Sequence, residues 1–249
     1  MSDKTHPTNL PGLISFWDFQ EVTGNPRVAK GPNAYELIEQ AGLMQRVDEG
    51  VFGPHAMLIK QGQWLRVPMS QASALNRPGK DAQVTVVAWL KRDVKNSREC
   101  EFVAGLWDET HKLRQYGLFL NLYIWDSGDQ VCGHVSNLGG PTPGYKYCMD
   151  ASIGKTPVEL NQWCCVGFTY DSKQAISYHN GKLDQREERN PYPYPGGLFD
   201  GGQVDADFTV GSVTRSGEMG NFFVGILGGL AVYDRALSMN EMASLARWC

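Results

Sequence analysis

The amino-acid sequence predicts an all-β fold, a two-sheet antiparallel β-sandwich with a short C-terminal helix. Short segments that alternate apolar and polar residues recur along the 249 residues, which is the pattern of strands buried on one face. Turn-forming residues separate these segments, in keeping with 28 glycines and 13 prolines. Sandwiches of this length occur as one unit, so we expect a single domain over residues 1–249, with residues 1–11 as a loose N-terminal segment.

The expected strands follow from the alternation, in chain order: residues 13–19, 57–60, 64–67, 84–91, 116–122, 130–136, 163–170, 175–179, 207–213 and 230–233. Residues 84–91 (VTVVAWLK) are apolar on both faces, which predicts a strand in the middle of a sheet. The pair Asn180-Gly181 tolerates positive φ and predicts a tight type I′ hairpin.

The C-terminal helix is predicted from its capping residues. Ser238 can cap it, and Glu241 follows three residues later, which completes a capping box. Met242, Leu245 and Ala246 then form an apolar stripe. We therefore expect this helix to lie against the sandwich.

Charge and composition exclude several classes of protein. The formal net charge is -4 and the basic residues are scattered, so we expect no nucleic-acid partner. No apolar run approaches the roughly 20 residues of a membrane-spanning helix. We expect a soluble protein with no membrane partner, cytoplasmic as written, or secreted or periplasmic if a signal peptide has been removed. The six cysteines include no CxxC pair, which favours buried, reduced thiols.

Five segments resemble, in the same order, the concanavalin A-like lectin/glucanase superfamily and its laminin-G-like jelly-roll domains: GLISFWDFQE, GPHAMLIKQGQWLRVP, VTVVAWLKR, ELNQWCCVGFTYDSKQAISYHNGKL and VGILGGLAVYDRALSMNEM. The resemblance implies two stacked, curved sheets whose concave face holds sugars in relatives. The superfamily includes lectins, binding modules, glycoside hydrolases and polysaccharide lyases, so the fold alone leaves the function open.

The resemblance also bears on metal binding. Many relatives carry Asp-Glu where this chain has Gly228-Gly229, and an acidic residue near that position often helps to hold a structural calcium ion. We expect no required cofactor. If a structural Ca²⁺ is bound, Asp18 in the first strand is the best remaining carboxylate for it.

Residues 107–150 concentrate the polar and aromatic groups that could bind or transform a ligand. In a strand over 130–136, Gln130 and His134 share one face. The turn-forming GGPTPG segment then lets the chain fold back, which would set Lys146 or Tyr147 near His134.

This set of residues predicts a catalytic site for β-elimination of a uronic-acid polymer. A cation or an amide must stabilise the carboxylate and the developing enolate, for which Arg114, Gln130 and Lys146 are candidates. A neutral His or Tyr must move the proton, for which His134 and Tyr147 are candidates. The set also resembles the Arg, Gln-x-His and Tyr-Lys motifs of alginate-lyase sandwiches, with the difference that three residues, instead of one, separate Gln130 from His134.

Other residues are candidates for substrate binding, because sugars stack on aromatic faces. These are Trp107, Trp125 and Tyr145 near predicted loops or strand ends, together with Asn121 and His179. Trp17, Trp89 and Trp163 lie in alternating patterns and are expected in the core.

The favoured function is binding of a polysaccharide or oligosaccharide in a concave groove. A polysaccharide lyase is the alternative. A glycoside hydrolase needs paired carboxylates, and the adjacent Asp108-Glu109 and Glu187-Glu188 resemble solvated loop charges more than such a pair. A non-catalytic assembly domain is the remaining alternative, and the sequence does not define the oligomeric state.

Overall fold

The chain folds into two sheets that pack face to face, as the alternating segments predict. The computed structural model describes residues 4–95, 97–202 and 205–249. The nine-stranded sheet has the order β14 (Lys182–Leu183), β13 (Gln174–His179), β12 (Trp163–Tyr170), β7 (Val84–Arg92), β19 (Gly225–Tyr233), β5 (Ala56–Ile59) and β4 (Gln45–Val47), with β1 (Leu13–Trp17) on β19 and β15 (Tyr192–Pro193) on β13.

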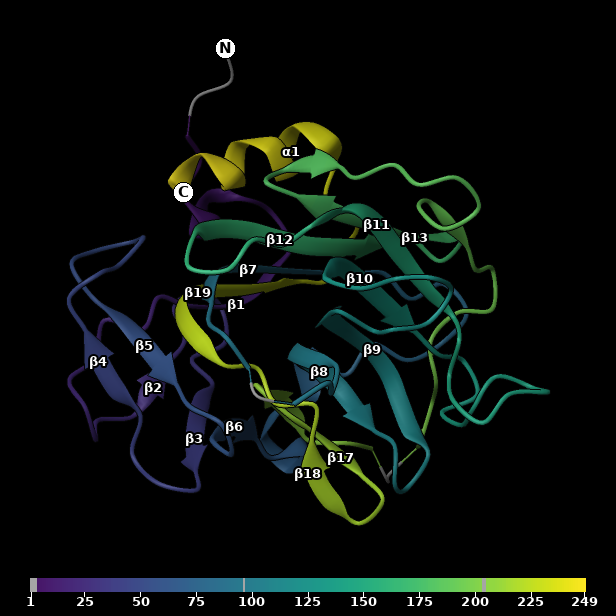
Figure 1. The fold of residues 1–249 in the computed structure, drawn as a ribbon, viewed down its shortest axis with the longest axis horizontal. Helices are drawn as coiled ribbons and strands as arrows, with labels where there is room; N and C mark the ends of the chain where they lie inside the picture. Colours follow the sequence, from purple (N-terminus) through teal and green to yellow (C-terminus); the bar gives the residue numbers. More distant parts are fainter. Residues whose placement is uncertain (1–3, 96, 203–204) are drawn as a thin grey trace.

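The ten-stranded sheet lies opposite (Figure 1). Its order is β11 (Ala151–Pro157), β10 (Gln130–Val135), β9 (Leu113–Leu120), β8 (Glu101–Asp108), β16 (Phe208–Val210), β6 (Trp64–Val67), β3 (Glu36–Gln40) and β2 (Arg27–Val28), with the hairpin of β17 (Val213–Arg215) and β18 (Glu218–Gly220) beside β8. Strand pairs are antiparallel apart from a short parallel contact of β17 with β8. The predicted antiparallel β-sandwich is confirmed.

The main core lies between the sheets and is built by alternate residues of their strands. Val84, Val86 and Ala88 of β7 belong to it, as do Leu106 of β8 and Leu118 of β9. As predicted, β7 occupies the middle of its sheet, between β12 and β19.

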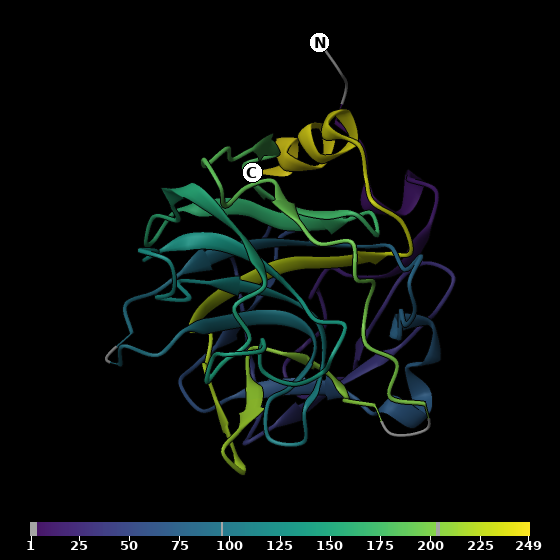
Figure 2. The same cartoon turned by 90° about the vertical axis from the view of Figure 1, so that its right-hand side faces the viewer.

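The other face of the nine-stranded sheet carries a second apolar cluster, covered by α1 (Met239–Leu245). Met242 and Leu245 of α1 pack in this cluster with Trp89 of β7, whose indole N–H donates to the Leu245 carbonyl at 3.1 Å. The predicted capping box is confirmed, because Ser238 accepts from the Glu241 backbone while the Glu241 side chain accepts from the Ser238 backbone. Figure 2 shows the helix at the same end of the molecule as in Figure 1.

The described part of the N-terminal segment is packed, unlike the loose segment that we expected over residues 1–11. The segment contains η1 (Pro7–Asn9), and the Pro7 carbonyl accepts from the Tyr233 hydroxyl at 3.0 Å. The indole N–H of Trp248, in η4 (Ala246–Trp248), donates to the Thr5 carbonyl at 2.8 Å. These bonds hold residues 5–9 against the end of β19 and the C-terminal helical turn.

The Asn180-Gly181 hairpin is confirmed. His179 pairs with Lys182, so the loop has two residues, and φ is 48° at Asn180 and 71° at Gly181. Residues 207–213, expected as one strand, form β16 and the start of β17 instead, because Gly211 turns the chain with φ of 84°. Two further turns, η2 (Met69–Gln71) and η3 (Ser73–Leu75), lead from β6 towards β7.

All six cysteines are free thiols, and four of them are buried, as expected for reduced residues of a core. In the part of the chain that the structure describes, no helix is long and apolar enough to cross a membrane.

Candidate functional site

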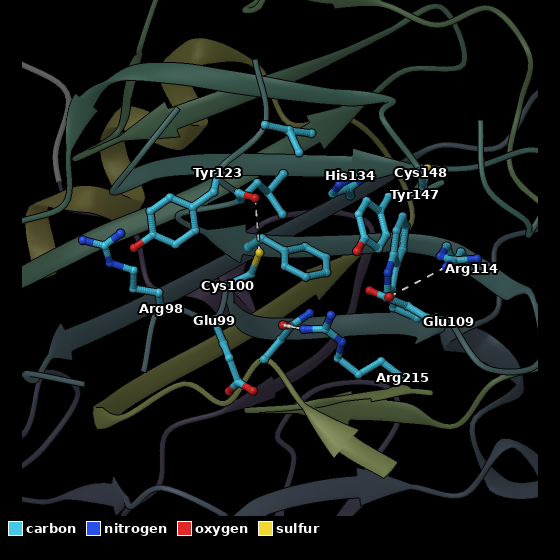
Figure 3. A pocket seen from close by; sticks show the side chains of 15 residues that line it. Arg98, Glu99, Cys100, Glu109, Arg114, Tyr123, His134, Tyr147, Cys148 and Arg215 are labelled. Carbon is cyan, nitrogen blue, oxygen red and sulfur yellow. Dashed lines mark hydrogen bonds and ion pairs between the residues drawn. The ribbon is translucent and has the colours of Figure 1, made fainter. Parts of the chain in front are cut away.

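A cavity of about 310 Å³ opens on the outer face of the ten-stranded sheet, the face that α1 does not cover (Figure 3). Its floor consists of Trp107 from β8, Phe119 from β9 and His134 from β10. We call it the His134 cavity; its lining residues are Arg98, Glu99, Cys100, Trp107, Glu109, Arg114, Phe119, Leu122, Tyr123, Ile124, His134, Tyr147, Cys148, Arg215 and Asn221. A volume of this size can accommodate a small ligand.

Strand alternation explains why these side chains share the outer face. Val131 and Val135 of β10 point into the main core, so Cys132 and His134 point outward. In β8, Leu106 points into the main core, so the next residue, Trp107, points to the outer face.

His134 is a buried polar group in the lining of the cavity. Its side chain is packed between aromatic rings, with ring centroids 4.6 Å from Trp107 and 5.3 Å from Phe119. The residue is only 3% exposed, and its Nδ1 has no hydrogen-bond partner among the described residues. Burial, assisted by the positive charge of Arg114, lowers the pKa of His134 to about 3. The imidazole is therefore neutral at neutral pH.

Cationic and anionic side chains surround this neutral imidazole. Arg114 donates to the Gly139 carbonyl at 3.1 Å, lies 3.7 Å from the Glu109 carboxylate and has its guanidinium carbon 6.0 Å from the centre of the Trp107 ring. Arg215 donates to the side-chain oxygen of Asn221 at 2.7 Å. Figure 3 shows Arg98 and Tyr123 at one end of the cavity and Arg114 and Glu109 at the other.

The loop after β10 folds back over the sheet, as the turn-forming GGPTPG segment predicts. The Thr142 backbone N–H donates to the Tyr147 carbonyl at 3.1 Å, and the Thr142 hydroxyl donates to the Asp150 carboxylate at 2.6 Å. These bonds close the loop and set Tyr147, 44% exposed, on the wall of the cavity. Four of the predicted residues, Trp107, Arg114, His134 and Tyr147, thus line one cavity, although their roles remain predictions.

Two of the residues predicted to take part in catalysis lie elsewhere. Gln130 does not line the His134 cavity, and its side-chain oxygen accepts from the Gly128 backbone at 2.6 Å. Lys146 is exposed, with its ammonium group 5.1 Å from the centre of the Tyr147 ring and outside the lining.

The predicted substrate-binding residues also separate. Tyr145 and Trp125 contact each other edge to face, 5.7 Å between ring centroids, beside the cavity and not in its lining. Asn121 is buried and donates to Glu101 at 3.2 Å. His179 lies in β13 of the opposite, nine-stranded sheet, so it cannot join the others.

Asp18, the carboxylate predicted for a structural Ca²⁺, is buried and forms an ion pair with the ammonium group of Lys30. Its role in metal binding remains a prediction. Among the residues that the structure describes, no three or more His, Cys, Asp or Glu side chains gather as metal ligands.

Several residues of the cavity were not among those predicted. Arg98, Glu99 and Arg215 supply charge, and Tyr123, exposed and in the left-handed region with φ of 55°, supplies an aromatic edge. Arg215 is the last residue of β17, which is distant in sequence from β8, and it reaches the cavity because β17 contacts β8. A half-buried arginine in a short polar hairpin gives no sequence signal of this kind.

The comparisons with known proteins bear on fold and family. A family model for the concanavalin A-like lectin/glucanases superfamily matches residues 66–243, most of the chain. The chain belongs to this superfamily. No curated protein matches the sequence significantly.

Solved structures of lectin-like domains share the superfamily fold. Domain 4 of AbnA, a GH43 extracellular arabinanase from Geobacillus stearothermophilus in complex with arabinotriose, has a TM-score of 0.62 and 16% identity, covering 94% of this chain and 98% of that one. The binding domain of botulinum neurotoxin serotype G has a TM-score of 0.59 and 10% identity, covering 94% and 50%. Trypanosoma rangeli sialidase in complex with the inhibitor DANA has a TM-score of 0.58 and 14% identity, covering 99% and 35%. At these identities, the likeness shows the fold.

Proposed function

We propose that this superfamily member binds an oligosaccharide or polysaccharide in the His134 cavity. The observation that carries the proposal is the Nδ1 of His134, which has no hydrogen-bond partner in the described part of the chain and is buried in an open cavity with aromatic walls. Buried polar atoms almost always have a partner, and a neutral imidazole can accept a hydrogen bond from a hydroxyl group. Sugars supply such hydroxyls, together with apolar C–H faces that pack against aromatic rings. The arabinotriose held by the Geobacillus domain of the same fold supports this reading.

Binding accounts for the site better than β-elimination does. A base that must remove a proton at neutral pH works best with a pKa near that pH, and burial holds the pKa of His134 at about 3. Gln130 and Lys146, two of the other four groups predicted for the reaction, lie outside the lining. His134 is therefore better suited to accept a hydrogen bond than to abstract a proton.

Hydrolysis has less support from this cavity. The carboxylates in its lining are Glu99 and Glu109. Glu109 lies 3.7 Å from Arg114, and Glu99 lies 3.9 Å from Lys95. Each of the two carboxylates thus lies next to a cation.

Binding to an array of oligosaccharides tests the proposal. We expect the isolated chain to retain at least one glycan without altering it, and Tyr147→Ala to weaken that binding about tenfold through loss of an aromatic wall. The matched control is Met239→Ala, which removes an exposed apolar side chain at the start of α1 and should bind as wild type. An array without any retained glycan would contradict the proposal, and formation of unsaturated uronates from a bound polymer would restore the lyase alternative.

A further inference from the structure

A second hollow adjoins the His134 cavity on the same face of the ten-stranded sheet. Its volume is about 370 Å³, and Trp107 belongs to the lining of both. We call it the Trp64 hollow, after the half-buried indole on β6; beside Trp64 and Trp107 it is lined by Asp108, Asp205, Asp207 and Thr209. An extended ligand that occupies the His134 cavity can therefore continue past Trp107 into this hollow.

The Trp64 hollow also holds a buried polar atom that needs a partner. Thr209 is 6% exposed, and its hydroxyl oxygen has no hydrogen-bond partner among the described residues. Thr209 lies on β16, which pairs with both β6 and β8 and so runs between Trp64 and Trp107. Each hollow thus combines an indole with a buried polar atom, Nδ1 of His134 in one and Oγ1 of Thr209 in the other.

The two hollows differ in charge. The lining of the His134 cavity contains three arginines, Arg98, Arg114 and Arg215, but only two carboxylates. Of these arginines, only Arg114 lies next to a carboxylate among the described residues. Positive charge is in excess there. An anionic ligand group would meet Arg98 or Arg215 without having to displace a carboxylate partner.

The Trp64 hollow has the opposite sign. Asp108, Asp205 and Asp207 line it, and its described lining contains no Lys or Arg. Asp108 accepts from the His111 ring at 2.8 Å, Asp205 from Asn76 at 2.6 Å, and Asp207 from Arg66 at 2.8 Å. These bonds fix the positions of the three carboxylates. Their oxygens can accept further hydrogen bonds from hydroxyl groups, and their negative charge repels an anion.

From this contrast we infer that the ligand is a mixed-charge oligosaccharide, with an anionic sugar unit in the His134 cavity and an uncharged unit in the Trp64 hollow. The inference rests on the proposed function and adds the charge pattern and the minimum length of the ligand. Trp107 separates the two units, and Thr209 hydrogen-bonds the uncharged one. Neither a neutral oligosaccharide nor a uniformly acidic one matches the charge of both hollows.

The test is a comparison of oligosaccharides by charge pattern. An array grouped into neutral, uniformly acidic and mixed glycans would include cellotetraose, tetragalacturonate and a hyaluronan tetrasaccharide, in which acidic and neutral units alternate. We expect mixed glycans to bind most tightly, and binding of the best of them to weaken with added salt. Tighter binding of a neutral or a uniformly acidic glycan would overturn the inference and leave the proposed function intact, whereas an array without binders would overturn both.

Two variants assign the charged and the uncharged units to their hollows. Arg215→Gln should weaken the best mixed glycan about tenfold or more, because a charge-assisted hydrogen bond is lost, and should leave neutral glycans unaffected. Thr209→Val keeps the side-chain shape and should weaken the mixed tetrasaccharide about fivefold, with no effect on an acidic monosaccharide. Equal effects of Arg215→Gln on neutral and mixed glycans, or unchanged binding of the tetrasaccharide to Thr209→Val, would contradict the assignment.

Conservative variants separate recognition from folding. Arg215→Lys and Thr209→Ser retain the charge and the hydroxyl, so each should recover most of the affinity. Arg247→Gln on the C-terminal helical turn and Thr5→Val in the N-terminal segment are matched controls far from both hollows, and they should bind as wild type. Failure of the conservative variants to recover binding, with thermal stability unchanged, would contradict the assigned contacts.

Discussion

At the scale of single residues, His134 couples the stability of the fold to pH. Its pKa is lowered to about 3 in the folded chain, against an ordinary value of 6.5, mainly by burial. Protonation is therefore easier in the unfolded chain, so the contribution to stability is complete above pH 6.5 and is lost as the pH falls towards 3. We expect the free energy of unfolding to fall by about 2 kcal/mol between pH 7 and pH 5 through this residue.

Urea unfolding at several pH values measures this loss. His134→Gln removes the titrating group, so its stability should depend less on pH over the same range. Gln71→Ala, at an exposed position without a titrating group, is the control and should keep the wild-type dependence. Parallel pH profiles for His134→Gln and wild type would show that His134 is not the group responsible.

The same residues show how far local sequence patterns predict a site. Alternation along 130–136 correctly set His134 on the outer face, and the turn-forming segment correctly brought Tyr147 back to it. Gln130 was expected beside His134, but the pairing of β10 with β11 shifts register between Gln130 and Cys132, and Gln130 contacts its own loop instead. Arg215 could not be predicted, because its position depends on how β17 meets β8.

At the scale of secondary-structure elements, the capping box of α1 should stabilise the cover over the nine-stranded sheet. Ser238→Ala removes the acceptor for the Glu241 backbone N–H and should lower the free energy of unfolding by about 1 kcal/mol. Ser238→Thr keeps the hydroxyl and should lose less. Ser70→Ala, exposed in η2, is the matched control, and an equal loss at Ser70 and Ser238 in urea unfolding would contradict the capping role.

The β13–β14 hairpin depends on a glycine for two separate reasons. Gly181 has φ of 71°, and a Cβ at this position would lie 2.6 Å from the Cβ of Ala246 in the C-terminal helical turn. Gly62, in the turn that connects β5 to β6, has φ of 87° with no atom within 4 Å of such a Cβ. Both Gly→Ala changes add backbone strain of about 1 kcal/mol, but only Gly181→Ala adds a clash.

We therefore expect Gly181→Ala to lower the melting temperature clearly more than Gly62→Ala does. The comparison is made by calorimetry on the two variants and wild type. Equal shifts in melting temperature would mean that the helical turn moves aside without loss of stability. Its contact with the hairpin would then contribute little to the stability of the fold.

The elements that the sequence pattern misses have identifiable physical causes. Regular alternation predicted β7 and β12 closely, since each pairs along its length without a register shift to the other. β8 has register shifts with β9 near Phe102 and near Trp107, which break the two-residue period, and it was not predicted. β11 was not predicted for a different reason. Its last three residues are exposed and end in Pro157, so this part of the strand has no apolar face.

At the scale of the whole molecule, a buried ion pair joins the two sheets. Arg92 of β7 donates from Nε and Nη2 to the carboxylate of Glu101 of β8, at 3.1 and 2.7 Å, and from Nη1 to the Val158 carbonyl at 2.8 Å. Asp129 accepts a further bond from Nη2 at 2.9 Å. Arg92 and Glu101 are 3% and 2% exposed, so neither charge could be solvated if its partner were removed.

Removal of one partner should therefore cost more than removal of both. Arg92→Met leaves the buried Glu101 without its guanidinium partner, and Glu101→Leu leaves Arg92 with the carboxylate of Asp129 alone. We expect each single change to lower the free energy of unfolding by about 3–5 kcal/mol. The double variant Arg92→Met/Glu101→Leu removes both charges and should be more stable than either single variant, so urea unfolding of the four proteins forms a double-mutant cycle. The surface pair of Arg66 and Asp207 is the control, with an expected coupling below about 1 kcal/mol. Additive losses at Arg92 and Glu101 would mean that the sheets are held together by the apolar core alone.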